Sequence, residues 1–290
     1  MASRGTIAAI AGGVLAVGAI LFWPRRASAS GAGLTLRVEP GRVRNLAPYV
    51  ADIRREGSAA GVLALQVGAH IMVESGGAPN AVRVEVEGVL ESDARRALQR
   101  EANADPAGFM DRFDRGELAG QARTASVGLM QILPATAREV GFTGPSRDLF
   151  VPEINIRYGT RYIGRQVRRY GGVARDAAAA YNAGSVKLAN PYIAGQLIVR
   201  AMEAKISPCA LVRSPRGATA QKIVAEVGGY FETASDQGAA QVLRAAGKNT
   251  PCNIEYVDSI VAWAIAIRDQ LPELGGDAEG LAGGVTLNPV

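Results

Sequence analysis

Glycine and proline divide the middle of this chain into short segments whose apolar residues recur at helical spacing. Apolar residues recur every three or four positions from Val62 to Val73, as on one face of an α-helix. This helix is predicted to begin at Ser58, a favourable N-cap residue, and to end at Gly76 and Gly77. Further helices are predicted over 134–140, 152–170 and 176–181, and from Asn190-Pro191 onward.

Between two of these helices the pattern changes. Val82, Val84 and Val86 alternate with charged residues, which predicts a short, half-buried strand. Residues 90–123 have the spacing of two charged helices, the second beginning at Asp105-Pro106. The chain is therefore predicted to be mainly α, with a short strand insert.

The flanking regions lack this regular pattern. Residues 27–57 are predicted to be a linker with one strand from Leu34 to Val38. Residues 58–206 form the predicted helical domain, and 207–290 a C-terminal helical extension and tail. Within the extension, Val257 to Leu271 is strongly apolar and predicts a docking helix.

The N-terminus carries a membrane signal. Residues 6–23 form an apolar run of 18 without a charge, at the short end of what spans a bilayer. One reading is a transmembrane anchor over 1–26, with Trp23 at the interface. The alternative is a cleaved signal sequence with a small-residue site at Ala27-Ser28-Ala29. Either reading predicts that the remaining chain leaves the cytoplasm.

Composition excludes several classes of site. The chain has one histidine and two cysteines, too few for most His-based or four-thiolate metal centres. Outside the cytoplasm Cys209 and Cys252 could pair, and two unpaired buried thiols are the other reading. The 32 basic and 27 acidic residues are interspersed, with few aromatics, so no nucleic-acid partner is expected.

Four segments carry residues typical of a catalytic site. They are Val73-Glu74-Ser75-Gly76, Ser126 through Ala137, Leu149 through Asn155, and Ala179 through Ser185. Together they resemble the catalytic domain of lytic transglycosylases of the soluble-transglycosylase (SLT) family. The shared motifs are Glu-Ser, Gly-Leu-Met-Gln and Ala-Tyr-Asn-Ala-Gly, in this order. The resemblance covers about residues 58–205 and implies a goose-lysozyme-like, α+β fold.

The position of Glu74 independently suits a general acid. A helix C-terminus disfavours an ionised carboxylate, and apolar neighbours such as Met72 and Met130 would add a desolvation cost. Both effects raise the pKa of a carboxyl group toward neutrality. The other reading of Glu74 alone is an ordinary exposed residue at a helix end.

The resemblance implies a reaction and a substrate. Peptidoglycan glycan strands are cleaved between N-acetylmuramic acid and N-acetylglucosamine, leaving a 1,6-anhydromuramic end. Glu74 would protonate the glycosidic oxygen and then, as the carboxylate, accept the proton of the muramic C6 hydroxyl. No metal or organic cofactor is needed for this chemistry.

Other roles follow from the resemblance, position by position. Ser75 would orient the acid, and Met130 and Gln131 would line the sugar cleft. Tyr181 would reach toward Glu74 or the sugar through its hydroxyl, and Asn182 would hold the loop or contact ligand. A separate observation is that His70 lies one turn before Glu74, where a satisfied helix histidine is expected and a partner of Glu74 is the alternative.

The spacing departs from that of many family members. Glu74 and Gln131 lie 57 positions apart, and Ala81-Val82-Arg83-Val84-Glu85 follows the acid. This arrangement resembles transglycosylases encoded in phages and prophages, as does Asn190-Pro191-Tyr192. Glu85 could supply a second carboxylate and permit hydrolysis by water, although a solvated strand face is the expected role.

Three functions therefore stay open. The expected one is a peptidoglycan lytic transglycosylase, and the second is a muramidase of the same fold. The third is a wall-binding component that assembles into a secretion or virion complex through residues 207–290. The expected locations are the inner membrane with a periplasmic catalytic domain, or a phage virion.

Overall fold

The computed structural model describes residues 38–86 and 92–275. The predicted membrane segment and almost all of the strand expected at 34–38 lie outside these residues. The described chain is mainly helical with two small sheets, which confirms the mainly α expectation. Its elements run in the order η1 (Pro40–Tyr49), α1 (Val50–Ala60), α2 (Ala64–Glu74), β1 (Val82–Val86), α3 (Ser92–Ala104), α4 (Pro106–Asp114), β2 (Ala122–Val127), α5 (Pro134–Glu139), η2 (Ser146–Phe150), α6 (Pro152–Arg169), α7 (Ala174–Ala183), β3 (Val186–Ala189), α8 (Pro191–Glu203), η3 (Pro208–Ala210), α9 (Ala218–Val227), β4 (Glu232–Ala234), α10 (Gln237–Ala245), β5 (Thr250–Pro251), α11 (Ile254–Gln270) and α12 (Pro272–Gly275).

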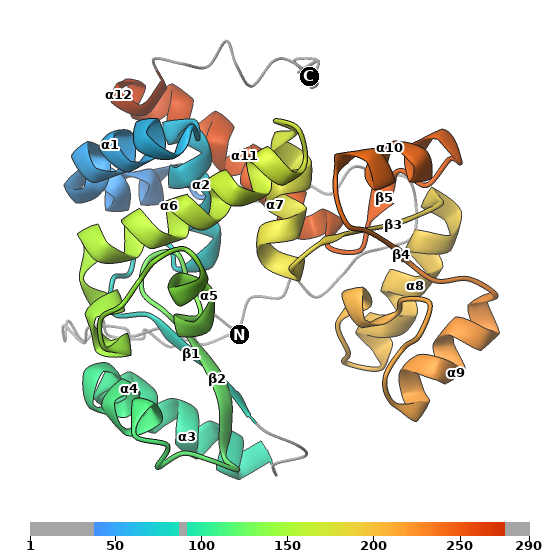
Figure 1. Ribbon diagram of the computed structural model, residues 1–290, viewed down its shortest axis with the longest axis horizontal. Coiled ribbons are helices and arrows are strands. Elements are labelled where there is room, and N and C mark those ends of the chain that lie inside the picture. The colour runs from blue at the N-terminus through green and yellow to red at the C-terminus, as the bar shows by residue number, and fades with distance from the viewer. Residues whose placement is uncertain (1–37, 87–91, 276–290) are drawn as a thin grey trace, which may run out of the picture. The chain divides into compact units, whose positions relative to one another are not determined.

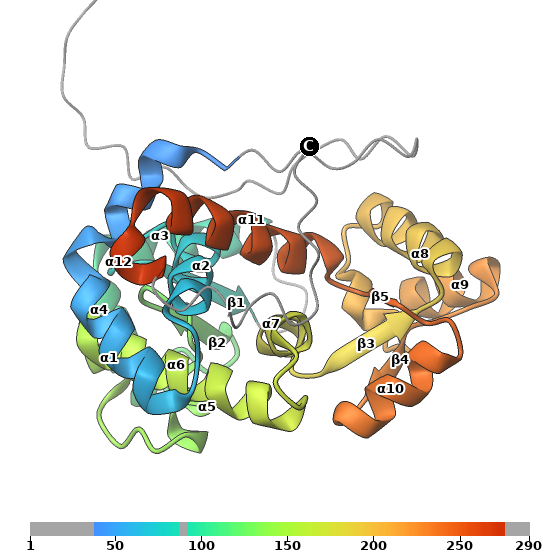
Figure 2. The ribbon, with the colours of Figure 1, turned by 90° about the horizontal axis from the view of Figure 1, so that it is seen from above.

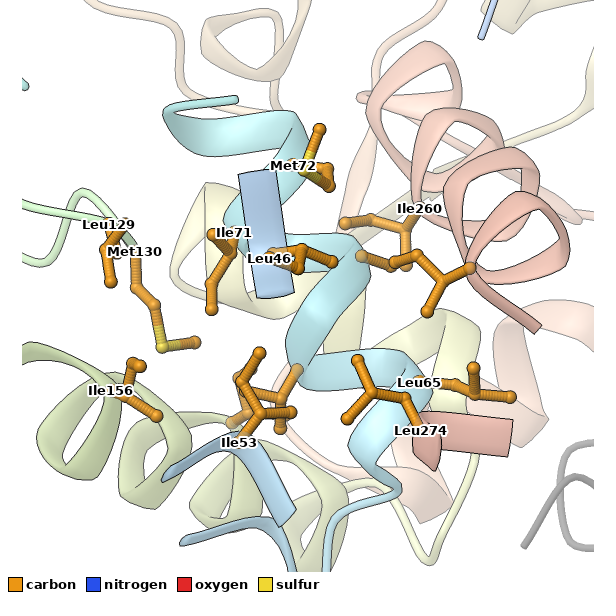
Figure 3. Packing of buried hydrophobic residues seen from close by; sticks show 14 of the residues in the cluster. Leu46, Ile53, Leu65, Ile71, Met72, Leu129, Met130, Ile156, Ile260 and Leu274 are labelled. Atoms are coloured by element: carbon orange, nitrogen blue, oxygen red, sulfur yellow. The ribbon is translucent and has the colours of Figure 1, made fainter. Parts of the chain in front are cut away.

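Helix α2 is the centre of the largest buried cluster. Eight consecutive residues, Leu65 to Met72, are buried, which suits a helix with apolar residues on nearly all sides. Figure 3 shows side chains from several other elements around it. They include Leu46 of η1, Ile53 of α1, Ile156 of α6 and Ile260 of α11. The residue that ends this helix, Glu74, is thereby held on a rigid element.

The predicted linker is wrong from Pro40 onward, because η1 and α1 occupy this segment and pack into the core. The helix predicted from Ser58 is wrong at its start for the same reason. Ser58 lies inside α1, which ends at Ala60, and α2 begins at Ala64. The helical stretch Gly41–Ala60, which includes α1, and α2 are bent by 119° relative to each other. Apolar spacing continues across the break, so the sequence pattern resembles one helix.

Strands β1 and β2 form an antiparallel pair beside α3 and α4 (Figure 1). β1 confirms the predicted strand, and Asp105 caps α4 by accepting a hydrogen bond from the Gly108 amide at 3.0 Å. β2 was not predicted, because Ala122–Val127 lacks a regular alternation of apolar and polar residues. Val82 and Val84 point into a second cluster with Phe109 and Met110, so Arg83 and Glu85 project from the opposite face of the strand.

Helices α5, α6 and α7 lie close to the ranges that glycine and proline predicted. One residue of α6 explains how it approaches the segment before α5. A Cβ on Gly159 would lie 2.4 Å from Sδ of Met130, closer than real side chains allow. Gly159 therefore admits Met130 into the core, and this contact fixes the Gly-Leu-Met-Gln segment against α6.

Residues 186–253 form a smaller unit of sheet and helices. β3 lies between β4 and β5, and both pairings are antiparallel. The C-terminal extension is therefore not wholly helical.

Cys209 and Cys252 form a disulfide with Cα atoms 5.0 Å apart. Of the two alternatives that the sequence left open, a disulfide and two unpaired thiols, the structure has the disulfide. Tyr192 of α8 is 74% exposed, because it lies in the first turn, outside the buried Ala194 and Leu197 stripe.

After this unit the chain returns to the first core. α11 lies along α2 (Figure 2) and contributes Ile260 and Ile267, while α12 contributes Leu274. The apolar helix predicted at 257–271 therefore docks on the chain's own α2. Among the described residues, no single helix is long and apolar enough to cross a bilayer, and one bent pair, Gly41–Ala60 with Ala64–Glu74, passes on length and composition alone.

Candidate active site

Glu74 is the last residue of α2 and keeps part of its surface accessible. Burial of the carboxyl group raises its pKa above the ordinary value. A hydrogen bond from Tyr256 and the positive charge of Arg83 act in the opposite direction and limit this rise. The predicted direction of the shift is confirmed, and its main cause is desolvation. Glu74 can therefore hold a proton closer to neutral pH than an exposed glutamate does.

Tyr256 is a partner of Glu74 that the sequence did not reveal. It lies in the first turn of α11, and its hydroxyl donates to Oε1 of Glu74 at 2.7 Å. Burial raises the pKa of Tyr256 well above its ordinary value, and the neighbouring Glu74 adds to this. The hydroxyl therefore stays protonated and remains a donor. The predicted apolar helix began one residue later, at Val257, so this tyrosine fell just outside the pattern.

His70 lies behind the same tyrosine. Its ring is fully buried, and Nδ1 is 2.9 Å from the Tyr256 hydroxyl. Positions i and i+4 share one face of a helix, so His70 and Glu74 of α2 both face this hydroxyl. The expectation of an ordinary satisfied histidine is wrong in one respect, since Nε2 is buried with no hydrogen-bond partner among the described residues.

Tyr181 lies close to this group but bonds elsewhere. Its hydroxyl donates to the main-chain oxygen of Met130 at 2.7 Å, and its ring centroid lies 4.7 Å from that of His70. The expectation that this hydroxyl bonds to Glu74 is therefore wrong, because its hydrogen is donated to the Met130 oxygen. Tyr256 makes the bond that was assigned to Tyr181.

Gln131 holds a turn and does not present its amide outward. Nε2 donates to the main-chain oxygens of Ala81 and Gly128, both at 3.0 Å, and Oε1 accepts from Ser126. Both amide hydrogens are thus used inside the protein. The expectation that Gln131 lines the sugar cleft through this amide is corrected. The amide instead joins the turn at Gly128 to the chain before β1.

Met130 is likewise corrected as a cleft residue. Its side chain is 0% exposed, because it fills the space that Gly159 leaves. What Met130 offers the site is its main chain. Its carbonyl accepts from Tyr181, and its N–H donates to Oδ1 of Asn155 at 2.7 Å.

Asn155 of α6 holds the same turn from the other side. It is fully buried, and its Nδ2 donates to the main-chain oxygens of Val127 and Leu149 at 2.9 and 2.7 Å. Gly128 has a φ of 74°, and a Cβ there would lie 2.2 Å from this amide nitrogen. Glycine is thus required in this turn on both grounds. The segment from Leu149 to Asn155 therefore shapes the turn in the segment from Ser126 to Ala137.

The remaining predicted residues have structural contacts. Ser75 is 2% exposed, and its hydroxyl donates to the Ile71 oxygen at 3.2 Å and accepts from the Gly77 N–H. It thus secures the turn that follows Glu74. Asn182 is exposed, and its Oδ1 accepts from Nδ2 of Asn253 at 3.0 Å, so it joins the end of α7 to the start of α11.

Arg83 is a second residue that the sequence reasoning did not assign. It is exposed on the outer face of β1, and its charge favours the ionised form of Glu74. Glu85 is exposed on the same strand face two residues later. A role for Glu85 as a second carboxylate stays a prediction. Arg83 could have been found from its place in the alternating strand pattern after the acid.

Within residues 38–86 and 92–275, no group of three or more His, Cys, Asp or Glu side chains could hold a metal ion. The chemical content of the site is one carboxyl group with a raised pKa, two protonated tyrosine hydroxyls and one nearby cation. This set can donate a proton and then take one back.

Comparison with protein families identifies the part of the chain that carries Glu74. The family model described as the transglycosylase SLT domain matches residues 53–192. The match begins in α1 and ends in α8, so it includes Glu74 and Tyr181 but not Tyr256. A solved structure of an inactive mutant of the lytic transglycosylase Slt from Pseudomonas aeruginosa is similar at 18% identity, with a TM-score of 0.36. The alignment covers 76% of this chain and 24% of that one.

Proposed function

Because residues 53–192 match the model of the transglycosylase SLT domain, we propose that the protein is a peptidoglycan lytic transglycosylase in which Glu74 is the catalytic acid and base. The observation that carries this proposal is the state of Glu74. Its carboxyl group ends a buried helix, has a pKa raised by burial, and is held by the Tyr256 hydroxyl. A general acid works best with a pKa near the working pH.

The proposed reaction uses one carboxyl group in two steps. Protonated Glu74 donates to the glycosidic oxygen, and the bond between that oxygen and C1 of N-acetylmuramic acid breaks. The C6 hydroxyl of the same sugar then attacks C1, and its proton passes to the Glu74 carboxylate. A 1,6-anhydro ring forms, the acid is regenerated, and no water is consumed.

The surroundings of Glu74 suit both steps. Desolvation favours the acid that the first step needs, whereas the Tyr256 hydrogen bond and the Arg83 charge favour the carboxylate that the second step needs. One influence thus favours each of the two forms between which the proposed reaction alternates.

A muramidase is the second candidate, because Glu85 and Arg83 project from the same face of β1 and the charge of Arg83 acts on Glu74. In that reaction Glu85 would activate a water molecule on the opposite face of the sugar. Inverting glycosidases of this kind separate their two carboxyl groups by about 6.5–9.5 Å.

The ends of the released products distinguish the two reactions. Purified protein is incubated with peptidoglycan sacculi in water enriched in heavy oxygen, and the released muropeptides are measured by mass spectrometry. A transglycosylase gives anhydromuramic ends without the heavy isotope. Reducing muramic ends that carry it would refute the transglycosylase and favour the muramidase, and Glu85→Gln would then abolish their release.

We also propose that residues 1–26 anchor the protein in the inner membrane with its catalytic domain in the periplasm, or that the protein belongs to a phage virion. The uncharged run at 6–23 supports the anchor. Membrane fractionation of the full chain beside a chain that begins at Ala27 tests this. A role of residues 207–290 in assembly cannot be tested by deletion, because removing them also removes Tyr256 from the site.

A further inference from the structure

One buried group beside the proposed acid has no part in the reaction as written. His70 is fully buried, and its Nδ1 lies 2.9 Å from the Tyr256 hydroxyl, which lies 2.7 Å from Oε1 of Glu74. Three side chains from two helices thus form an unbroken line that ends at one oxygen of the acid. The direction of the hydrogen bonds along this line determines which oxygen of Glu74 can carry the transferable proton.

The histidine in this line is neutral. Burial lowers its pKa to about 3, so at neutral pH the ring carries one N–H and one bare nitrogen. In the described part of the chain, the charged and titratable groups that face His70 or Glu74 are Tyr256 from α11, Tyr181 from α7 and Arg83 from β1. None of the three is a carboxylate that would stabilise an imidazolium.

The carboxylate form of Glu74 fixes the direction of the hydrogen bonds. A carboxylate can only accept, so the single hydrogen of Tyr256 must point at Oε1. The tyrosine oxygen then has only lone pairs to offer His70, and Nδ1 must carry the ring hydrogen. Nε2 is left bare, in agreement with its lack of a partner among the described residues.

We propose that His70 is a positioning residue, whose Nδ1–H holds the Tyr256 hydrogen on Oε1 of Glu74 and thereby keeps the transferable proton on Oε2. This inference rests on the proposed function. When Glu74 is protonated, Oε1 already accepts from Tyr256, and the acidic hydrogen therefore sits on the other oxygen. The opposite tautomer would turn the tyrosine hydrogen toward Nδ1 and draw the acidic hydrogen onto Oε1, away from the substrate.

The arrangement persists through the reaction. A change of tautomer requires a proton to arrive at Nε2, and this atom is buried without a neighbour that could supply one in the described part of the chain. The proton given and taken by Glu74 therefore stays on Oε2, and the hydrogens of Tyr256 and His70 do not move.

Nitrogen NMR of the full chain tests the tautomer directly. The chain contains a single histidine, so labelling histidine with the NMR-active nitrogen isotope gives one ring to assign. The proposal predicts that Nδ1 is protonated and Nε2 is bare, in wild type at neutral pH. A protonated Nε2 with a bare Nδ1, or a doubly protonated ring, would overturn it.

Kinetics on sacculi test the effect on Glu74. His70→Leu removes the donor, and we expect kcat to fall by about 10-fold, the loss of roughly one hydrogen bond, with KM unchanged. His70→Asn places an amide N–H as many bonds from Cα as Nδ1 and should restore kcat. A merely structural role predicts instead that both variants lose stability and kcat alike.

Two further variants complete the comparison. Once Tyr256→Phe has removed the hydroxyl, His70→Leu should cause no further loss of kcat, and an additional 10-fold loss would refute action through Tyr256. Gln66→Leu is the matched control, because Gln66 is buried one turn earlier on α2 with Nε2 also unpartnered among the described residues, and kcat should not change. Wild type that is inactive on sacculi would refute the proposed function, while the nitrogen spectrum would still decide the tautomer.

Discussion

The hydroxyl of Tyr256 lies 2.7 Å from Oε1 of Glu74, although 182 positions separate the two residues in the chain. This contact exists because α11 returns from the smaller unit and packs along α2. The C-terminal part of the chain is therefore a component of the candidate active site. Substitutions on either side of this contact should therefore change catalysis.

Tyr256→Phe should reduce activity and shift its pH dependence. The tyrosine hydrogen bond lowers the pKa of Glu74, so its loss should raise that pKa. The alkaline limb of the kcat profile, which reports loss of the acidic proton, should move to higher pH. At its optimum kcat should fall by about 10-fold, since Glu74 loses its anchor. A limb that moves to lower pH would contradict this account of the pKa.

Arg83→Ala should move the same limb in the same direction for a different reason. The positive charge of Arg83 stabilises the carboxylate of Glu74, so removing it should raise the pKa of Glu74. The side chain is exposed, and unfolding stability should change by less than about 0.5 kcal/mol. The pH profile of kcat is the measurement, with Arg95→Ala on the exposed face of α3 as the control. An unchanged limb in Arg83→Ala would show that its charge does not reach Glu74.

His70 should make the protein sensitive to acid. Its pKa is about 3 in the folded protein and about 6.5 in an unfolded chain. Below pH about 6.5 the unfolded chain binds a proton that the folded protein does not, so stability falls as pH falls. The loss should be about 1.4 kcal/mol for each pH unit down to the folded pKa.

Urea unfolding of wild type and His70→Leu at several pH values measures this effect. Glu74 has the opposite linkage, because its raised pKa favours the folded state as pH falls, but it is present in both proteins and cancels in the difference. The stability of wild type relative to the variant should therefore decrease steadily below pH about 6.5. A difference independent of pH would mean that His70 is already charged or is exposed.

The disulfide should stabilise the unit from which α11 begins. Cys209 and Cys252 are 43 positions apart, and closing a loop of this length stabilises a fold by about 4 kcal/mol in the chain-entropy view. Replacing both cysteines by serine should lower the free energy of unfolding by that order. Wild type in reductant should behave like the double variant, and equal stability in oxidising and reducing buffer would argue against the bond.

The sequence predicted the helices that glycine and proline mark most clearly. α6 and α8 begin where Pro152 and Pro191 place them, because proline suits the first turn and cannot continue a preceding helix. The break between α1 and α2 was missed, since Val62 and Leu65 keep a helical spacing across it. The spacing of apolar residues along the sequence does not show where the helix axis changes direction.

The candidate site was predicted only in part. Glu74 was found because its motif and its place at a helix end both point to it. Met130 and Gln131 were placed in the right segment but given the wrong role, since burial behind Gly159 and bonds to Ala81 depend on tertiary packing. Tyr256 was missed because nothing local links it to a residue 182 positions earlier.

Glu74→Gln tests the central claim most directly. The amide keeps the size of the side chain but has no transferable acidic proton, so general acid catalysis worth about 10²–10⁴-fold should disappear. The measurement is the amount of anhydromuropeptide released from sacculi by wild type and by the variant, with equal folding checked by thermal unfolding. The account predicts abundant release by wild type and almost none by Glu74→Gln. Release at the wild-type rate by a folded Glu74→Gln variant would contradict it.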